Sequence, residues 1–199
     1  AFDGDGDRLI AVGKNGEIYD GDMLVYVVAV ALKRRGLLNH GTVALTKMSN
    51  LGLLKALERQ GIATVQTDVG DKYVLEAMET SDYTLGGENS GHIIDRHLLN
   101  TGDGVLNALH ILSIMTAAGA GLDVLTQDVH LYPDRLVNLR GIDKTLAKHP
   151  AVLAKAAEVA SRLGTDGKVL VRASGTEPLI RVSVSAPTMG QVDAAIAEI

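Results

Sequence analysis

Along the first 125 residues, segments with the hydrophobic pattern of β-strands alternate with segments that have the pattern of helices. Segments rich in β-branched residues and bounded by turn-forming residues predict strands at 9–12, 17–19, 42–46, 62–67 and 83–86. Apolar residues at helical spacing predict helices at 20–35, 50–61 and 104–118, and another that opens near 69–73. Asp20 and Asn50 are expected to cap the first two of these helices. Strands and helices alternate in this way in α/β domains. We therefore expect an α/β domain with a mixed or parallel sheet over residues 9–125.

The pattern changes in the last third of the chain. Strands are predicted at 136–140, 169–171 and 180–184, with one helix from Pro150 to Gly164 and another that Thr188 caps. The glycine-rich stretch 118–122 is expected to make the backbone more flexible, and we place a domain boundary near residues 123–130. The order strand, helix, strand, strand, helix predicts a smaller α+β domain with an antiparallel sheet over residues 126–199.

The composition of the chain argues against several classes of function and of site. Hydrophobic residues make up 46% of the chain and aromatic residues only 3%, so Leu, Val, Ile and Ala must fill the core. The formal charge of −5 argues against nucleic acid or an anionic membrane as a partner. The absence of cysteine excludes disulfides and thiolate metal sites and fits a reducing, cytoplasmic compartment. The longest apolar run, residues 23–32, is too short to span a bilayer.

The chain begins with Ala1 inside a motif and reaches Ile199 within a helical pattern. We therefore expect a piece of a longer protein.

Three aspartates alternate with glycines at the start of the chain. Asp3, Asp5 and Asp7 can face one side of a looped backbone, where two carboxylates about 4 Å apart repel by roughly 4 kcal/mol at a dielectric of about 20. A hard divalent cation turns this arrangement into an oxygen cage, and Arg8 suits a site where the metal and a guanidinium share a phosphate. A solvated acidic turn is the alternative. An EF-hand is excluded, because Arg8 and Lys14 stand where its glycine and glutamate would be.

A second polar loop joins the last two predicted strands. It offers hydroxyls from Ser174 and Thr176, backbone N–H groups around Gly175, and guanidinium groups from Arg172 and Arg181. Such a set of donors holds a phosphate group. An ordinary hairpin loop with two surface arginines is the alternative, and a P-loop is excluded because its Gly-Lys-Ser/Thr ending is absent.

A third polar loop follows the strand predicted at 83–86. Glu88 and Ser90 are two residues apart and can hydrogen-bond vicinal sugar hydroxyls, while a solvated turn is the alternative. His92 is interpreted as a core or loop-bracing histidine, and an acid/base or a ligand is the alternative. The sequence assigns no general acid or base.

These three loops carry a family resemblance. The segments 3–8, 87–92 and 172–178 resemble, in order, the metal, sugar and phosphate loops of the α-D-phosphohexomutases. Three further segments resemble the bacterial phosphoglucosamine mutase branch of that family, namely 69–74, 101–104 and 132–133. The resemblance covers essentially the whole chain. It implies that residues 1–8 end a preceding domain, that residues 9–125 form domain III, and that residues 126–199 form domain IV.

The resemblance also implies an activity and roles. The reaction interconverts glucosamine 6-phosphate and glucosamine 1-phosphate through a 1,6-bisphosphate, with a phosphoserine that lies upstream of this chain. Mg²⁺ would bind Asp3, Asp5 and Asp7, and Arg8 would neutralise the transferred phosphoryl group. The sugar hydroxyls and the non-reacting phosphate would contact Glu88, Ser90, Arg172, Ser174, Gly175, Thr176 and Arg181. Lys72 is a weaker candidate for a substrate contact.

Three alternatives stay open at this point. The sugar loop also allows a phosphoglucomutase or phosphomannomutase of the same family. Without the phosphoserine, the chain by itself fits a non-catalytic module that binds phosphosugars, and we expect it to lack turnover. A metal-dependent phosphatase is disfavoured, because no aspartyl nucleophile motif stands apart from the Asp3 loop. The sequence leaves open whether the parent protein is a homodimer.

Overall fold

The computed structural model describes residues 1–175 and 177–199, and its contacts divide into two units, Ala1–His130 and Leu131–Ile199. Each unit has its own hydrophobic core. Residues 126–130, which we expected in the second domain, lie in the first unit. Val129 is buried in its core, and the Thr126 hydroxyl donates to the Leu122 carbonyl at 2.7 Å. Residues 1–8 also contact this unit, and their assignment to a preceding domain stays a prediction.

The first unit contains most of the predicted elements. Its strands and helices are β1 (Ala11–Val12), β2 (Ile18–Tyr19), α1 (Gly21–Arg34), η1 (Asn39–Gly41), β3 (Thr42–Thr46), α2 (Leu51–Arg59), β4 (Ala63–Thr67), α3 (Asp71–Thr80), β5 (Leu85–Gly87), β6 (Ile93–Asp95), α4 (Gly104–Ala118) and α5 (Leu122–Leu125). The predicted strand at 9–12 is shorter, and the one at 83–86 begins later. Strand β6 was not expected from the sequence, because it is a short run that forms a strand only by pairing with β5 in the folded chain.

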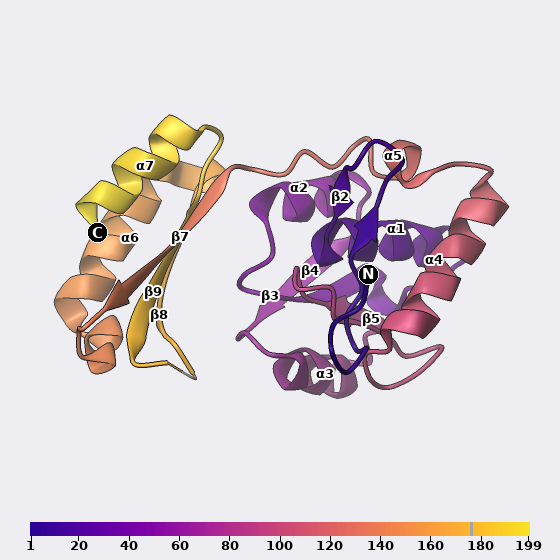
Figure 1. Ribbon diagram of the computed structural model, residues 1–199, viewed down its shortest axis with the longest axis horizontal. Helices are drawn as coiled ribbons and strands as arrows, with labels where there is room; N and C mark the ends of the chain where they lie inside the picture. The colour runs from indigo at the N-terminus through magenta and orange to yellow at the C-terminus, as the bar shows by residue number, and fades with distance from the viewer. Residues whose placement is uncertain (176) are drawn as a thin grey trace. The chain divides into compact units, whose positions relative to one another are not determined.

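A mixed sheet forms the middle layer of this unit. Its strand order is β4-β3-β5-β6, in which β6 alone is antiparallel to its neighbour. Helices α1 and α2 cover one face and α3 covers the other (Figure 1). Val43 and Leu45 of β3 point to the first face, and Ala44 packs against Val74 and Met78 of α3. The alternation of side chains along β3 thus separates two helical layers, which confirms the predicted α/β class.

Helix α1 is central to the core of the first unit. The Asp20 carboxylate caps it by accepting the Met23 amide at 3.1 Å, as the sequence predicted. Its outer side is covered by α4, which buries Ile111 and Ile114 in the same core. Among the helices that the structure describes, none combines the length and apolar character needed to cross a membrane.

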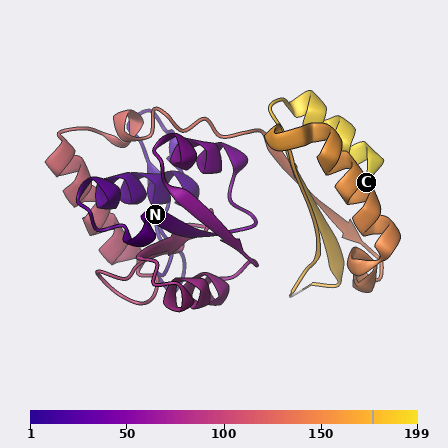
Figure 2. The ribbon, with the colours of Figure 1, turned by 180° about the vertical axis from the view of Figure 1, so that it is seen from behind.

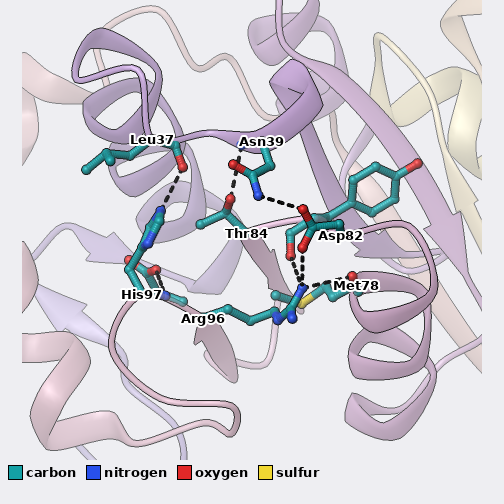
Figure 3. Close-up of polar contacts among 9 residues, drawn as sticks. Leu37, Asn39, Met78, Asp82, Thr84, Arg96 and His97 are labelled. Atoms are coloured by element: carbon teal, nitrogen blue, oxygen red, sulfur yellow. Dashed lines mark hydrogen bonds and ion pairs between the residues drawn. The ribbon is translucent and has the colours of Figure 1, made fainter.

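A polar cluster closes the edge of the sheet where β3 and β5 begin (Figure 3). The guanidinium of Arg96 donates to the carbonyls of Met78 and Tyr83 at 3.2 and 3.3 Å and lies 3.3 Å from the Asp82 carboxylate. Asn39 connects the two strand entries, because its amide donates to the Thr84 hydroxyl at 3.0 Å. These contacts stabilise the edge opposite to the one that carries the candidate site.

The second unit is an antiparallel sheet with helices on one face (Figure 2). Its elements are β7 (Asp134–Arg140), η2 (Lys144–Lys148), α6 (Pro150–Leu163), η3 (Gly164–Asp166), β8 (Lys168–Ala173), β9 (Leu179–Ser185) and α7 (Met189–Glu198). The strand order is β7-β9-β8. Val171, Ile180 and Val182 point toward α6 and α7 and form the core with Val159 and Val192. The predicted α+β architecture is confirmed, and within this unit the other face of the sheet carries no helix among the described residues.

Candidate functional site

The carboxyl ends of the parallel strands β3, β4 and β5 lie at one edge of the first sheet, where α/β proteins bind ligands. Glu88 directly follows β5 and is buried. Its Oε1 accepts the Gly70 amide at 3.0 Å, from the loop after β4. Its Oε2 accepts the Ser90 hydroxyl at 3.4 Å. The structure therefore brings the two predicted sugar-binding residues together, while their role stays a prediction.

Lys47 was missed by the sequence analysis. It directly follows β3, and its Nζ lies 2.7 Å from Asp68 Oδ1 in the loop after β4. This hydrogen bond lowers the pKa of Asp68. The signal that could have found it is a single lysine placed just after a strand of buried residues. Lys72, the weaker candidate, lies in the first turn of α3, where its Nζ is 4.6 Å from the centre of the Tyr73 ring.

The acidic loop forms a compact group of carboxylates. Oxygen atoms of Asp3, Asp5 and Asp7 all lie within 4.8 Å of one another. A β-bridge between Phe2 and Leu9 closes the base of the loop. The carboxylates are largely exposed, and oxygen ligands at this spacing can converge on one hard cation. Asp7 Oδ1 is buried and accepts no hydrogen bond within the described residues, so it keeps an acceptor available for such an ion.

The charges of this loop are unbalanced. Burial, followed by the negative charges of Asp5 and Asp3, raises the pKa of Asp7. Arg8 opposes this only in part, because its Nε lies 3.6 Å from Asp3 Oδ2 and 3.8 Å from Asp7 Oδ1. Although loss of solvent contact acts in the opposite direction, the Arg8 amide and the Asp7 side chain hold the pKa of Asp3 below its usual value. A bound cation would relieve the repulsion that remains.

The acidic loop and the Glu88 loop are direct neighbours. The Leu9 amide donates to the Gly91 carbonyl at 3.0 Å, and Arg8 forms an isolated β-bridge with His92. Gly91 has a φ of +96°, and a Cβ there would lie 2.3 Å from the Leu9 carbonyl oxygen. Only glycine allows this approach. The backbone thus connects the predicted metal and sugar loops.

His92 lies beside the acidic loop. Its ring is buried, and Nε2 lies 3.6 Å from Asp7 Oδ2. A Cβ at Gly102 would lie 2.3 Å from this nitrogen, so the loop before α4 packs directly on the ring. His92 was interpreted from the sequence as a core or loop-bracing residue. Its contact with Asp7 was not expected, because nothing in the sequence relates two positions so far apart.

The predicted phosphate loop joins β8 and β9 in the second unit. Ser174 is buried, with its amide donating to the Leu179 carbonyl at 2.9 Å and its hydroxyl accepting the Glu177 amide at 3.2 Å. Its hydroxyl therefore braces the loop. Gly175 is exposed, and a Cβ there would meet no atom within 4 Å. Thr176 lies outside the described residues.

Two predicted arginines lie side by side in the second unit. Arg172 on β8 is the register partner of Arg181 on β9. Both point to the face without helices, because their neighbours Val171 and Val182 point to the core. Like charges directly opposite each other destabilise a sheet, so this pair favours an anion between or above the two groups. Arg140 and Glu177 lie beside them and were not expected from the sequence. Glu177 Oε2 accepts from Arg181 Nη2 at 3.0 Å, and Glu177 Oε1 accepts from Arg140 Nη2 at 3.5 Å.

Both units of the chain match models of domains from one known protein family. Residues 20–132 match the model of the phosphoglucomutase/phosphomannomutase alpha/beta/alpha domain III, and residues 136–199 match the model of the C-terminal domain of the same family. The chain belongs to the phosphoglucomutase/phosphomannomutase family. This confirms the resemblance that the three loops indicated.

Two curated relatives of this chain are named phosphoglucosamine mutase. A phosphoglucosamine mutase of Leuconostoc mesenteroides is 52% identical over 194 residues, which are 97% of this chain and 43% of the relative. A phosphoglucosamine mutase of Geobacillus thermodenitrificans is 53% identical over 189 residues, 94% of this chain and 42% of the relative. The chain therefore spans less than half the length of the curated relatives it matches.

Two solved structures have the same fold as this chain. An Aspergillus fumigatus N-acetylphosphoglucosamine mutase in complex with GlcNAc-6P and magnesium superposes with a TM-score of 0.83 at 21% identity, over 99% of this chain and 46% of that one. A putative phosphomannomutase from Thermus thermophilus gives a TM-score of 0.69 at 25% identity, over 99% of this chain and 44% of that one. The predicted fold class of both units is thereby confirmed.

Proposed function

We propose that this chain is the C-terminal part of a phosphoglucosamine mutase, which interconverts glucosamine 6-phosphate and glucosamine 1-phosphate. The observation that carries the proposal is the backbone connection between the acidic loop and the Glu88 loop, through Leu9–Gly91 and Arg8–His92. Such a connection places a cation site beside a carboxylate and a hydroxyl that suit a sugar. The substrate is supported by relatives named phosphoglucosamine mutase, which are 52% and 53% identical to this chain over nearly its whole length.

Asp3, Asp5 and Asp7 would hold Mg²⁺, and the residues present fit this ion. They offer clustered hard oxygen ligands, and Asp7 keeps a buried oxygen without a hydrogen-bond donor among the described residues. When bound, Mg²⁺ supplies electrostatic stabilisation of charge on a transferred phosphoryl group. Arg8, whose guanidinium is half exposed beside these carboxylates, would contact the same phosphoryl oxygens.

The other loops would position the substrate. Glu88 would accept and Ser90 would donate hydrogen bonds with sugar hydroxyls, exchanging part of their mutual contact for contacts with the ligand. Arg172 and Arg181 would bind the phosphate that does not react, since two guanidinium groups on one sheet face match its oxygens. The Ser174 hydroxyl, the Gly175 amide and Thr176 complete the proposed phosphate loop. Binding energy at this remote phosphate orients the reacting end of the sugar.

Transfer requires a group that accepts and returns the phosphoryl group, which we propose is a phosphoserine in the part of the longer protein that this chain does not contain. The chain by itself would then bind phosphosugars without turning them over. Turnover by the purified 199 residues would contradict this part of the proposal.

The proposal is tested on the full-length parent protein, with Mg²⁺ and a phosphorylated serine. We expect kcat/KM for glucosamine 1-phosphate to exceed the values for glucose 1-phosphate and mannose 1-phosphate by about a hundredfold, or roughly 2.7 kcal/mol. Equal values, or a preference for glucose or mannose, would instead support the alternative of a phosphoglucomutase or phosphomannomutase. A parent without any mutase activity would leave the non-catalytic binding module as the better description.

A further inference from the structure

Glu177 lies between two guanidinium groups in the second unit. Its Oε2 accepts from Arg181 Nη2 at 3.0 Å, and its Oε1 accepts from Arg140 Nη2 at 3.5 Å. Its backbone belongs to the phosphate loop, because its amide donates to the Ser174 hydroxyl at 3.2 Å. The carboxylate is partly exposed and therefore in contact with solvent as well as with both arginines. The Glu177 carboxylate, an anion of the protein itself, therefore already occupies the Nη2 donor of Arg181.

Arg140 shares the open sheet face with the two arginines of the phosphate loop. Asn138 on β7 is the register partner of Arg181, and Arg140, two residues further along β7, points to the same side of the sheet. Arg140 is therefore a diagonal neighbour of Arg181, close enough for long side chains to interact. Arg140, Arg172, Arg181 and Glu177 together have an excess of two positive charges. A phosphate monoester carries about −1.5 to −2 at pH 7 and would balance it.

Only part of the Arg181 guanidinium is engaged by Glu177. Its Nε is buried and has no hydrogen-bond partner among the described residues, whereas its Nη2 binds the Glu177 carboxylate. A guanidinium binds phosphate best through two parallel hydrogen bonds. A phosphate that uses Nε and Nη2 together competes with the carboxylate for Nη2. A displaced carboxylate can stay paired with Arg140, whose Nη2 already lies 3.5 Å from its Oε1.

We propose that Glu177 is an internal counter-ion that a phosphate group displaces from Arg181, and that Arg140 is the positioning residue that then holds its carboxylate. This inference rests on the phosphate-binding role proposed above for Arg172 and Arg181. Before binding, Glu177 limits the repulsion between the clustered arginines. During binding, it moves toward Arg140, which it already contacts, and exposes Arg181 to the ligand. Competition by Glu177 weakens the site, and Arg140 reduces that competition.

The test is a titration of the 199-residue chain with inorganic phosphate, followed by ¹⁵N-resolved NMR of backbone amides and of the arginine Nε–H groups. We expect Glu177→Gln to tighten phosphate binding about threefold, as removal of one exposed ion pair allows. We expect Arg140→Gln to weaken binding about threefold, because Glu177 then stays at Arg181. In the Glu177→Gln background, Arg140→Gln should have no further effect.

Two variants at the ion pair between Arg135 and Asp193 serve as controls. Asp193→Asn and Arg135→Gln change the charge by the same amounts at an ion pair of the same unit outside the loop, and we expect them to leave binding unchanged. Weaker binding in Glu177→Gln would mean that Glu177 orients Arg181, which overturns the inference. An equal loss from Arg140→Gln in both backgrounds would mean that Arg140 contacts phosphate directly, which also overturns it.

Failure of the proposed function is recognised separately with Arg181→Gln. If the chain binds no phosphate, or binds it equally well in Arg181→Gln, the phosphate loop itself is wrong and the inference falls with it. If Arg181→Gln abolishes binding while Glu177→Gln leaves it unchanged, only the displacement of Glu177 is overturned.

Discussion

The imidazole of His92 lies against the carboxylate of Asp7, with Nε2 3.6 Å from Oδ2. The histidine is buried behind the Glu88 loop, whereas Asp7 belongs to the exposed acidic loop. The contact is a consequence of the β-bridge between Arg8 and His92, which places the two side chains at the same edge of the first unit. Asp7, a proposed ligand of the cation, thus contacts the segment that also carries the proposed sugar-binding residues Glu88 and Ser90.

Asp7→Asn should weaken Mg²⁺ binding by about tenfold or more, because it removes one carboxylate of the proposed cage. Isothermal titration of the chain with Mg²⁺ measures this. In the presence of EDTA the same variant should be more stable to urea than the unchanged chain, since the repulsion from Asp3 and Asp5 that raises the Asp7 pKa is gone. Asp134→Asn, at an exposed position in the second unit, is the matched control. Unchanged Mg²⁺ affinity in Asp7→Asn would refute the metal assignment.

Gly91→Ala should separate the acidic loop from the Glu88 loop. The new Cβ would lie 2.3 Å from the Leu9 carbonyl oxygen, and φ of +96° is unfavourable for alanine. We expect a loss of about 1–3 kcal/mol in the free energy of unfolding and weaker Mg²⁺ binding. Gly175→Ala serves as the control because no atom lies near its Cβ position. Equal stability of the two variants in urea would contradict the close contact between the loops.

Stability should fall below about pH 6.5 because of His110. Burial lowers the pKa of this histidine and Arg35 lowers it further, while Asp95, 3.4 Å away, acts in the opposite direction. The unfolded chain then binds more protons than the folded chain below pH 6.5, so stability decreases as the pH drops through this window.

Replacing the histidine tests this assignment. Urea unfolding between pH 5 and 7.5 should show a smaller decrease for His110→Gln than for the unchanged chain, and no such difference for the exposed His130→Gln. A decrease of equal size in all three proteins would assign the pH dependence to other groups.

Leu57→Ala should cost about 2–5 kcal/mol in the free energy of unfolding of the first unit, because Leu57 on α2 is fully buried in its core. Leu109→Ala on α4, where the side chain is 61% exposed, should change it by less than about 0.5 kcal/mol. Chemical denaturation monitored by circular dichroism compares the two. A similar loss in both variants would mean that the outer face of α4 is covered in solution.

Local signals in the sequence predicted most of the helices. Asp20, Asn50 and Thr188 were expected as caps, and each accepts a backbone amide at the start of its helix. These predictions held because a cap depends on residues within one turn of each other. The strand β6 was missed, since its three residues pair with β5 only after the intervening loop has folded back.

By itself, the sequence determined the two architectures, the order of the three polar loops and the family they resemble, because periodicity, caps and motifs are local properties. The tertiary structure alone decided which of these groups meet: His92 with Asp7, Lys47 with Asp68, and Glu177 with Arg140. Such contacts depend on sheet order and register, which bring together residues that are distant in the chain. Strand register also placed Arg172 opposite Arg181, a charge repulsion that their spacing in the sequence does not reveal.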